Sequence, residues 1–468
     1  MIEGNPETPE RPHFEYGVPV IVVGGGASGA VAALAARAAG AAVLLIEQDA
    51  SPTGTTAMSQ GLVCAAGTQA QAAVGISDDA DTMFADIMAK TRGQTDPVIA
   101  RAIADGAGPC VDWLASEIGY PFALDTGFRA AYGHTRQRLH GWPGHGGADM
   151  VQFLHAKLAE RGVDVLLQAR LVEIIADGLT VAGIVVERPD GAREAIGCSA
   201  LVLACGGFAA NHAMVAAHMP EAAAARHHGH EGNRGDGIRL GAAIGAALGD
   251  MGSYQGYAML ADPHGITVPP GLLVEGGIIL NRMGDRFTNE VIDIAGMVHP
   301  VLAQPDGAAW VVIDARIEAH NAYTLEVQAL RANGAIRSVA DPADLAAMMG
   351  ADAAAISAVL ADVNDAAASG RDDAQGRSWA DTLPPRWPLR AIKVCGAIYH
   401  TQGGLQIDGE ARVLREDGAR FSNLFASGGA ARGVSGPSYW GYLPAMGLGS
   451  AVTLGRIAGM AAAAVVAG

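Results

Sequence analysis

A glycine-rich turn near the start of the chain has the residue types and spacing needed to bind phosphate. Residues 20–29 read VIVVGGGASG and join an apolar run to an alanine-rich stretch. Such a turn lets a buried strand pass into a helix whose N-terminal amides and positive dipole end face a pyrophosphate. Glu47 ends the next apolar run. There its carboxylate can accept hydrogen bonds from both ribose hydroxyls and repel a 2′-phosphate. The order strand, turn, helix, strand, acid predicts a bound adenine dinucleotide.

The elements that must position this turn follow the pattern of an α/β protein with an insertion. From about residue 252 to 399 the strand rhythm breaks down into helical segments such as 345–368, and it resumes near 404. We therefore predict one discontinuous domain, residues 1–251 and 400–468, with a second domain, residues 252–399, inserted into it. Amphipathic helices are expected at 97–118 and 146–161, and strands at 163–168, 171–175, 181–187 and 201–204.

Composition excludes several classes of partner. A formal net charge of −17, from 31 basic and 48 acidic residues, argues against nucleic acid and anionic membrane surfaces. The five cysteines form no C-x-x-C pair, so no disulfide framework, zinc site or haem attachment is indicated and a cytoplasmic location fits best.

Residues 1–17 lack the apolar stretch of a signal peptide. The apolar run 457–466 is too short to span a membrane, and we expect it to form a closing helix packed on the sheet.

Further glycine-rich turns give the chain a family resemblance. Together with segments 67–76 and 275–290, they resemble those of the flavoprotein family of fumarate reductases, succinate dehydrogenase flavoprotein subunits and 3-ketosteroid dehydrogenases, from Val18 to Gly459. The resemblance implies an α/β fold, in which a Rossmann-like FAD-binding domain of the glutathione-reductase type carries an inserted α+β capping domain. The turns lie at 53–61, 204–211, 235–237, 400–404, 428–429 and 447–459.

FAD is the cofactor that the resemblance implies, stretched across the fold and held by amides from both chain ends. Relatives attach flavin covalently through a histidine early in the loop after the second strand. None lies between Glu47 and Gly61, so we expect non-covalent FAD. Gly429 stands where many relatives place a glutamate that holds the ribityl chain. The helix near Gly449 would aim its N-terminus at the isoalloxazine. The expected FAD-binding residues are Gly24, Gly26, Ala27, Ser28, Gly29, Glu47, Gln48, Thr55, Thr56, Ser59, Gly61, Leu171, Ala204, Gly206, Asn211, Asp236, Gly403, Gly429, Gly449, Ser450 and Val452.

The substrate residues of the fumarate-reducing relatives are mostly replaced in this chain. Those relatives hold a dicarboxylate with two histidines and an arginine, and a further arginine donates the proton. At the matching positions Tyr257 replaces the first histidine, and Ile294 replaces the proton-donating arginine. The second histidine is retained as His400. The clamping arginine is replaced within 438–444. The loss of both arginines argues against fumarate or succinate as substrate.

Tyrosines at these positions point to the ketosteroid dehydrogenase branch. Those enzymes use tyrosines near the flavin to polarise a ketone and remove its α-proton while a β-hydride passes to flavin N5. The catalytic candidates are Tyr257, Tyr439 and Tyr442, with His400 beside them. A tyrosinate base would need its pKa of about 10 lowered. We predict an FAD-dependent oxidoreductase of CH–CH bonds that desaturates a ketone or reduces the enone, with an electron partner that sequence does not identify.

Other interpretations of these residues stay open. Tyr257 could be core at a domain junction, and Tyr439 and Tyr442 could pack with Trp440. Arg136, Arg138 and His140 lie in a long irregular loop, 123–148, and are candidates to bind an anionic substrate group or to pair with surface carboxylates. If an arginine of that loop supplied the clamp, the enzyme would reduce an unsaturated acid other than fumarate. A third alternative is an electron-transferring flavin subunit without its own substrate.

A histidine-rich segment has the residue types of a metal site. It contains His227, His228, His230 and Glu231 directly before the turn at 235–237. At this spacing a polar loop is favoured over a metal site, and we predict no bound metal. Cys205 is expected to have no redox role.

Overall fold

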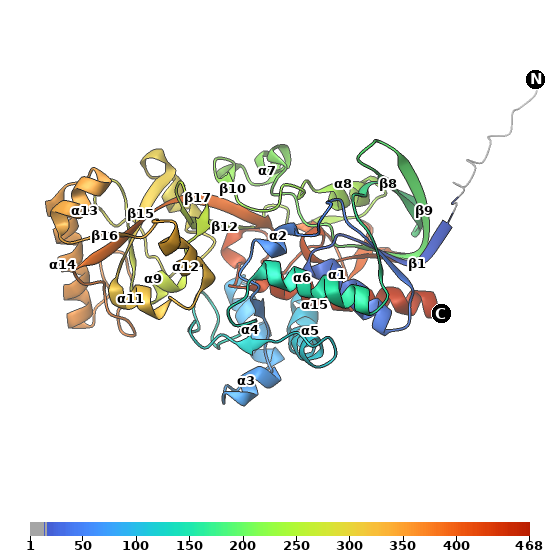
Figure 1. Cartoon of the computed structure of the whole chain (residues 1–468), viewed down its shortest axis with the longest axis horizontal. Coiled ribbons are helices and arrows are strands. Elements are labelled where there is room, and N and C mark those ends of the chain that lie inside the picture. Colours follow the sequence, from blue (N-terminus) through green and yellow to red (C-terminus); the bar gives the residue numbers. More distant parts are fainter. Residues whose placement is uncertain (1–13, 15) are drawn as a thin grey trace, which may run out of the picture.

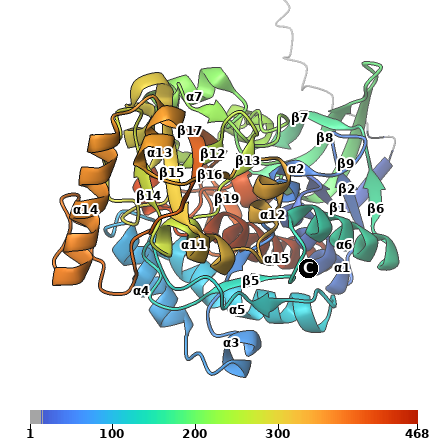
Figure 2. The ribbon, with the colours of Figure 1, turned by 60° about the vertical axis from the view of Figure 1, so that its left-hand side comes forward.

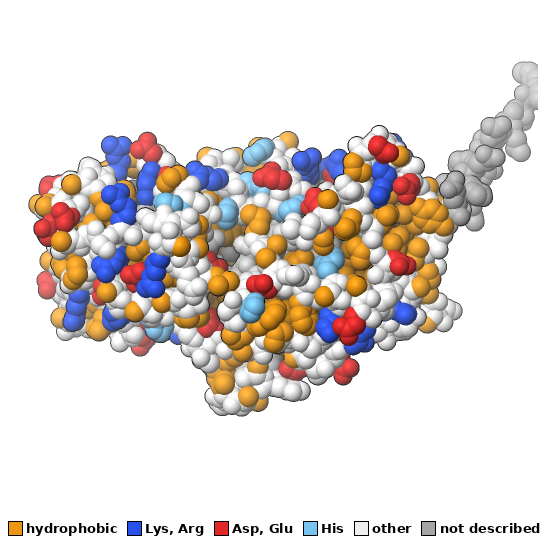
Figure 3. Space-filling model, viewed as in Figure 1, with side chains coloured by type: hydrophobic (Ala, Val, Ile, Leu, Met, Phe, Trp, Pro, Cys, Tyr) orange, Lys and Arg blue, Asp and Glu red, His pale blue; other side chains and the backbone are white. Residues whose placement is uncertain are grey.

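The computed structural model describes residues 14 and 16–468 and consists of two lobes, each built on its own sheet (Figure 1). The N-terminal stretch in which we expect no signal peptide lies mostly outside the described residues. On the face drawn in Figure 3, acidic and basic side chains are interspersed over both lobes.

The first lobe contains an eight-stranded sheet with β1 at its centre. The strand order is β19-β20-β9-β1-β2-β6, and β7 and β8 extend it as an antiparallel pair along β9. Residues 20–23 of β1 pair in parallel with β2 on one side and β9 on the other. They are buried on both faces, as expected for an apolar run inside a parallel sheet. The strands are β1 (Tyr16–Val23), β2 (Val43–Ile46), β6 (Asp164–Leu166), β7 (Arg170–Asp177), β8 (Thr180–Glu187), β9 (Arg193–Leu203), β19 (Arg412–Leu414) and β20 (Arg420–Ala426).

Helices α1 (Ala27–Ala38) and α15 (Met446–Ala467) pack closely together in this lobe. Glycines permit the approach, because a Cβ on Gly455 would collide with the carbonyl oxygen of Ser28, and one on Gly459 with that of Ala32. Helix α15 is longer than the run expected from the sequence. By length and composition it is the one helix in the described residues able to cross a membrane, but half of its most apolar window is buried inside the protein.

The secondary structure expected for residues 97–204 is confirmed. Helix α5 (Pro97–Ser116) begins after Asp96, whose side chain accepts a hydrogen bond from the Val98 amide, and α6 (Gly147–Glu160) follows the long loop. The four expected strands correspond to β6, β7, β8 and the end of β9.

The second lobe is richer in strands than the sequence suggested. Its seven-stranded sheet has the order β13-β12-β17-β15-β14, and β10 and β16 also pair with β17. The helix expected at 345–368 is two helices, because Gly350 adopts a left-handed conformation with φ 73° and ends the first. The strands are β10 (Arg226–His227), β12 (Tyr254–Ala261), β13 (Ile266–Thr267), β14 (Ile278–Leu280), β15 (Ala308–Asp314), β16 (Arg337–Val339) and β17 (Leu389–Thr401).

The two halves of that expected helix, α13 (Pro342–Met349) and α14 (Ala353–Ser369), form the outer edge of the second lobe (Figures 1 and 2). Strand β10 precedes residue 252 and β17 ends at Thr401, so the exact domain boundaries stay a prediction. The mixed α/β class itself is confirmed.

Most of the remaining elements are short. The remaining strands are β3 (Val63–Cys64), β4 (Ala123–Leu124), β5 (Leu139–Gly141), β11 (Leu248–Gly249) and β18 (Gly404–Leu405). The remaining α-helices are α2 (Gly54–Ala57), α3 (Gln69–Ala73), α4 (Ala80–Lys90), α7 (His212–His218), α8 (Asp236–Ala243), α9 (Gly271–Val274), α10 (Val298–Leu302), α11 (Ala315–His320) and α12 (Leu325–Ala332). Four 3₁₀ turns lie at Pro220–Ala222, Pro305–Gly307, Gly428–Ala430 and Tyr439–Gly441.

Candidate active site

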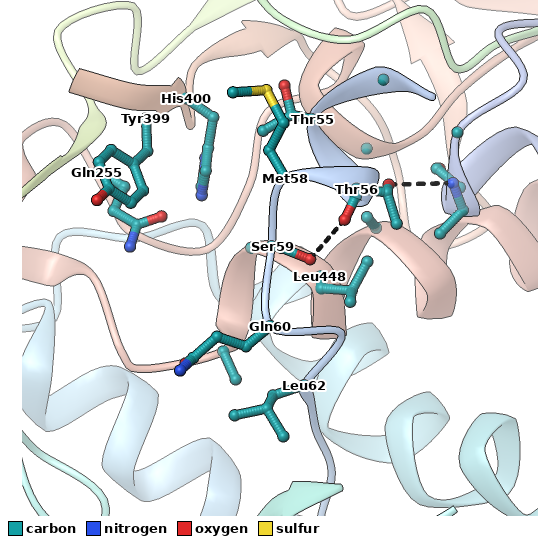
Figure 4. Close-up of a pocket in the computed structure, with 18 of the residues that line it drawn as sticks. Thr55, Thr56, Met58, Ser59, Gln60, Leu62, Gln255, Tyr399, His400 and Leu448 are labelled. Atoms are coloured by element: carbon teal, nitrogen blue, oxygen red, sulfur yellow. Dashed lines mark hydrogen bonds between the residues drawn. The ribbon is translucent and has the colours of Figure 1, made fainter. Parts of the chain in front are cut away.

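A cavity of about 740 Å³ extends from the glycine-rich turn of the first lobe to residues of the second. At one end, here called the nucleotide end, it is lined by Gly24–Ser28, Glu47 and Asp236. At the other, here called the substrate end, it is lined by Gln255, Tyr257, Ile294, Glu326, Tyr399, His400 and Tyr442. Figure 4 shows Gln255, Tyr399 and His400 grouped opposite the segment that runs from Thr55 to Leu62.

Glycines at the nucleotide end bring strand and helix together. Gly24 has φ 114°, and a Cβ there would collide with the carbonyl oxygen of Ala204. A Cβ on Gly29 would collide in turn with the carbonyl oxygen of Gly24. Glu47 is buried, and its Oε2 accepts a hydrogen bond of 2.7 Å from the Gly25 amide. The carboxylate therefore holds the turn in place from the end of β2.

Two helix N-termini meet the cavity without a capping side chain of their own. Helix α1 follows Gly26, and α15 follows Ala445, which adopts a left-handed conformation with φ 58°. The Ala27 amide donates to Thr56 Oγ1 at 3.2 Å, which Figure 4 also shows. No N-cap side chain accepts a hydrogen bond from the first-turn amides of α1 or α15, so these amides can donate to a ligand. Paired positive dipole ends suit the pyrophosphate and the electron-rich ring of FAD.

The middle of the cavity is shaped by close backbone contacts. Thr55 Oγ1 accepts a hydrogen bond of 2.6 Å from the side-chain amide nitrogen of Asn233. Gly206, with φ 76°, leaves room for the side chain of that asparagine. A Cβ on Gly429 would lie 2.6 Å from the backbone nitrogen of Gly207. This contact explains why the chain has no glutamate at 429, since any side chain there would collide with the neighbouring turn.

His400 is a partly buried, neutral hydrogen-bond donor at the substrate end. Its Nδ1 lies 2.9 Å from the side-chain amide nitrogen of Gln402, which can only donate. Nδ1 also lies 3.4 Å from the Thr401 carbonyl oxygen, a contact that would need the proton on Nδ1. We assign Nδ1 as the acceptor and place the proton on Nε2 because the contact with Gln402 is the shorter of the two. Burial lowers the pKa of His400 to about 4, so the ring is neutral at pH 7.

Tyr442 is a second neutral donor next to this histidine. The two rings lie 5.8 Å apart between centroids. Burial raises the pKa of Tyr442 above its usual range, and the neighbouring Gly447 backbone opposes this shift only in part. Among the described residues Tyr442 donates no hydrogen bond to another side chain or carbonyl, so its phenol proton is available to a ligand.

Tyr257 and Tyr399 form the aromatic wall beside these donors. Their ring centroids are 5.1 Å apart. The Tyr257 hydroxyl donates to the carbonyl oxygen of Val268 at 2.8 Å, and Tyr399 shares a hydrogen bond of 2.8 Å with Thr267. Burial raises the pKa of both tyrosines above the usual range, which is opposite to the lowering that a tyrosinate base needs.

Fixed positive charge is missing from the substrate end. Within the described part of the chain, Arg170 is the single lysine or arginine that lines the cavity, and it forms an ion pair of 2.8 Å with Asp236 at the nucleotide end. Ile294 lies on the cavity wall and is 5% exposed. Arg286 and Glu290, which precede it in the chain, form a buried ion pair. Arg286 also pairs with Asp373 and Glu290 with Arg377, so these charges are satisfied within the protein.

Most of the expected cofactor residues lie on the cavity wall. Those that line it are Gly24, Gly26, Ala27, Ser28, Glu47, Gln48, Thr55, Thr56, Ser59, Leu171, Ala204, Gly206, Asp236, Gly429 and Ser450. Those that lie behind it are Gly29, Gly61, Asn211, Gly403, Gly449 and Val452. Several of the latter permit close packing: a Cβ on Gly449 would lie 2.8 Å from the Cys64 carbonyl oxygen. Asn211 instead caps α7 by accepting from the Met214 amide.

The anion-binding candidates Arg136, Arg138 and His140 require a correction, because none of these three residues lines the cavity. Arg138 is fully buried and forms ion pairs with Asp78 at 2.7 Å and Asp86 at 2.5 Å. His140 is buried with its Nε2 2.8 Å from Thr68 Oγ1. Arg136 is exposed and donates to the Thr135 carbonyl oxygen. The predicted anion-binding role is therefore wrong for the arrangement that the structure shows. Other parts of the same loop, residues 123–128 and 141–145, do line the cavity.

Tyr439 also lies outside the cavity wall. Its ring packs against His299 at 4.2 Å and Tyr254 at 5.9 Å between centroids. Tyr439 therefore packs in an aromatic cluster, but with His299 and Tyr254 and not with Trp440, as the sequence alternative had it.

Sequence reasoning missed Gln255, Tyr399 and Glu326. The side-chain period of two in a strand places Gln255 on the same face as Tyr257, so that residue could have been found. Glu326 lies on α12 in a segment without a motif. Only the fold of the second lobe brings it to the cavity.

The histidine segment forms no metal cluster. Among the described residues no group of three or more metal-ligating side chains is present. His230 Nε2 lies 2.8 Å from an Asp49 carboxylate oxygen. The His228 ring is tilted by 55° against the Tyr399 ring, with 5.0 Å between centroids.

Comparison with known proteins gives the chain its relatives. A family model described as FAD binding domain matches residues 19–442. An NADH:fumarate oxidoreductase of Klebsiella pneumoniae (strain 342) is 29% identical over 89% of this chain, which spans 45% of that relative. The chain therefore spans about half the length of this curated relative.

Two solved structures share the fold over nearly the whole chain. The open conformation of a flavocytochrome c3 fumarate reductase has a TM-score of 0.80 and 28% identity, covering 97% of this chain and 79% of that one. A 3-ketosteroid-Δ4-(5α)-dehydrogenase from Rhodococcus jostii RHA1 has a TM-score of 0.76 and 25% identity, and the match covers 96% of this chain and 98% of that one.

Proposed function

Because the chain belongs to the FAD binding domain family, we propose that it is an FAD-dependent oxidoreductase of CH–CH bonds that acts on a ketone. It either desaturates a cyclic or ketosteroid-like ketone next to the carbonyl or reduces the corresponding enone. FAD is held non-covalently, and a separate electron acceptor or donor, working in the cytoplasm, completes the cycle.

The observation that carries this proposal is the charge of the substrate end. A dicarboxylate bound there would be desolvated without a cationic partner, which is strongly unfavourable. A ketone needs no such partner. The neutral donors Tyr442 and His400, 5.8 Å apart between ring centroids, suit a single carbonyl oxygen.

The chain's own residues would act on the carbonyl group. Hydrogen bonds from the Tyr442 hydroxyl and His400 Nε2 strengthen as negative charge develops on the ketone oxygen, which stabilises the transition state more than the bound ketone. Gln402 keeps the His400 proton on Nε2. The Tyr257 hydroxyl donates its proton to the Val268 carbonyl oxygen. Its ring therefore forms part of the cavity wall and connects β12 to the segment 266–271.

When bound, FAD supplies the two-electron oxidation or reduction by exchanging a hydride with the substrate β-carbon. The residues that would hold it are the turn at 24–28, Glu47, Thr55 and the first turn of α15. Beside these segments the charged pair Arg170–Asp236 is satisfied within the protein, and glycines keep the wall open for an extended dinucleotide.

Anaerobic mixing of the purified yellow protein with a substrate panel tests the proposal. The panel contains saturated cyclic ketones and 3-ketosteroids, matched saturated carboxylic acids and succinate, with flavin bleaching as the readout. The photoreduced protein is then mixed with enones and unsaturated acids. We expect bleaching by ketones and reoxidation by enones. Bleaching by succinate alone, or reoxidation by unsaturated acids and not enones, would favour an acid-reducing enzyme. No response to any compound would favour an electron-transferring subunit.

A further inference from the structure

A carboxyl group without a counter-charge lies at the substrate end. Glu326 is in the first turn of α12 and lines the cavity. No described lysine, arginine or histidine forms an ion pair with it. Glu318 on the preceding helix α11 is different, because Arg331 and Arg390 both pair with it, at 2.6 and 3.3 Å. Glu318 therefore has charged structural partners, whereas Glu326 lines the cavity without an ion pair among the described residues.

The partner of Glu326 across the cavity is neutral. Its carboxyl interacts with the side chain of Gln60, which belongs to the first lobe, and Figure 4 shows Gln60 on the segment facing Gln255 and His400. A glutamine amide can donate to a carboxylate and accept from a carboxylic acid. It therefore supports both protonation states of Glu326, which an acid–base residue must adopt in turn.

Glu326 lies within electrostatic reach of the aromatic wall. Its charge contributes to raising the pKa of Tyr257, Tyr399 and Tyr323. Burial in turn raises the pKa of Glu326 itself, while Gln60 opposes the shift. A carboxyl whose pKa moves towards neutral pH is better matched to proton transfer from carbon than an ordinary surface glutamate.

The other titratable groups facing this region are less suited to take a proton. The three tyrosines of the wall, Tyr257, Tyr399 and Tyr442, are held neutral. His400 has a pKa of about 4, and burial also lowers the pKa of His228. The Asp125 carboxylate accepts from the Gly127 and Phe128 amides and from the Tyr323 hydroxyl, so it holds a turn.

We propose that Glu326 is the catalytic base that removes the α-proton of the ketone and returns it in the reverse reaction. This inference rests on the function proposed above. The Glu326 carboxylate takes the proton, and the electron pair of the α-C–H bond forms the new carbon–carbon double bond. Negative charge that develops on the carbonyl oxygen is held by Tyr442 and His400. The β-hydride leaves with its electron pair to the oxidant, FAD, so the products are the enone, protonated Glu326 and reduced cofactor.

Proton exchange without oxidation tests this assignment on the full-length protein. Photoreduced protein in D₂O cannot oxidise a saturated cyclic ketone, but its base can still exchange the α-protons, which NMR measures with cyclohexanone as the probe. In Glu326→Gln the exchange rate should fall at least about 100-fold, the lower range for general acid–base catalysis. Cyclohexanone affinity should change less than about threefold, because a neutral amide replaces a group that touches only the α-carbon hydrogen.

Two further variants keep the test specific. Glu326→Asp retains a carboxyl and should recover part of the exchange. Glu275→Gln removes a carboxylate of the same lobe that pairs with Arg129 outside the cavity wall, and its exchange should equal that of the wild type. In the wild type the rate should rise with pH through the raised carboxyl pKa and then level off, and Glu326→Gln should lose this rise.

Each result decides between the two proposals. Wild-type exchange in Glu326→Gln, or an equal loss of exchange in Glu275→Gln, would overturn the role of Glu326 while leaving the ketone function intact. A wild-type protein that neither binds nor is bleached by ketones would overturn the proposed function and this inference with it.

Discussion

The two ends of the cavity recognise their ligands by different means. The nucleotide end is built mainly from backbone, with glycines that allow close approach and the amides at the N-terminus of α1. Its charge pair, Arg170–Asp236, is satisfied within the protein. The substrate end is built from side chains, with neutral donors, an aromatic wall and one unpaired carboxyl. A backbone site restricts which residues fit at each position, whereas a side-chain site can change its chemistry by single substitutions. One scaffold can therefore keep its cofactor while its substrate changes.

The largest effect is expected from a substitution that breaks the nucleotide end. In Gly29→Ala the new Cβ would collide with the Gly24 carbonyl oxygen, forcing α1 away from β1. We expect destabilisation of at least about 3 kcal/mol and loss of bound FAD. In Gly26→Ala the new Cβ would meet only Thr56 Oγ1, at 3.4 Å, so that variant should fold and differ in flavin affinity alone. Thermal unfolding measures the stability of both variants, and flavin absorbance measures their FAD content. Equal stability of Gly29→Ala and Gly26→Ala would contradict the packing argument.

The buried arginine of the loop 123–148 should affect stability and not specificity. Arg138→Met leaves Asp78 and Asp86 buried without their partner, which should cost about 3–5 kcal/mol. Arg136→Met is the matched control on an exposed arginine and should be neutral. Chemical denaturation of both variants measures stability, and KM for the substrate measures specificity. A raised KM in both variants with unchanged stability would instead restore the arginines as substrate ligands.

The neutral donors of the substrate end should control turnover. Tyr442→Phe removes one hydrogen bond to the developing oxyanion and should lower kcat/KM for a ketone about 100-fold, with FAD content unchanged. Tyr439→Phe, in the aromatic cluster outside the cavity, is the control and should retain activity. If Tyr439→Phe caused the larger loss, the assignment of the two tyrosines would be reversed.

A positive charge at the substrate end should move its specificity towards acids. Ile294→Arg places a guanidinium on the cavity wall, and a charged hydrogen bond of about 1.5 kcal/mol would tighten binding of an unsaturated carboxylate about tenfold. Ile294→Met is the control for size. Competition of carboxylates against ketone turnover provides the measurement. Unchanged carboxylate inhibition would mean that residue 294 does not face the substrate.

The last prediction concerns stability at mildly acidic pH. Burial lowers the pKa of His134 and His400 to about 4, from 6.5. Between these values the unfolded state binds more protons than the folded state, so stability is lost as pH falls from 6.5 towards 4. Each histidine contributes a slope of about 1.4 kcal/mol per pH unit at most. His400→Gln should reduce the slope in pH-dependent thermal unfolding, and an unaltered slope would show that this ring binds protons equally in the folded and unfolded states.

Sequence reasoning reached the nucleotide end because its residues are tied to backbone geometry. Gly29 is required by a contact within one strand–turn–helix unit, Gly24 by a contact with Ala204 at the end of the neighbouring strand β9, and Glu47 lies at the end of β2. Gly449 and Val452 were predicted as ligands but support the wall from behind, because a glycine motif does not tell contact from packing. For Arg138, residue type suggested a ligand, and only the fold shows Asp78 and Asp86 enclosing it.

The substrate end was reached only where a motif was adjacent. His400 and Ile294 were located from flanking residues, and they do line the cavity. Glu326 was missed because nothing near it in the chain marks it. The pairing of β12 with β17 brings Tyr257 and His400 together across more than a hundred residues, which no local pattern encodes.

The central claim, that neutral donors select a ketone at the substrate end, is tested most directly by the carbonyl stretch of a bound ligand. Infrared difference spectra of a ¹³C-carbonyl-labelled cyclic ketone bound to the oxidised protein would record it in the wild type and in Tyr442→Phe. We expect the stretch to move to lower frequency on binding and to return part of the way in Tyr442→Phe. A stretch that does not move on binding, or a ketone displaced completely by succinate, would contradict the account.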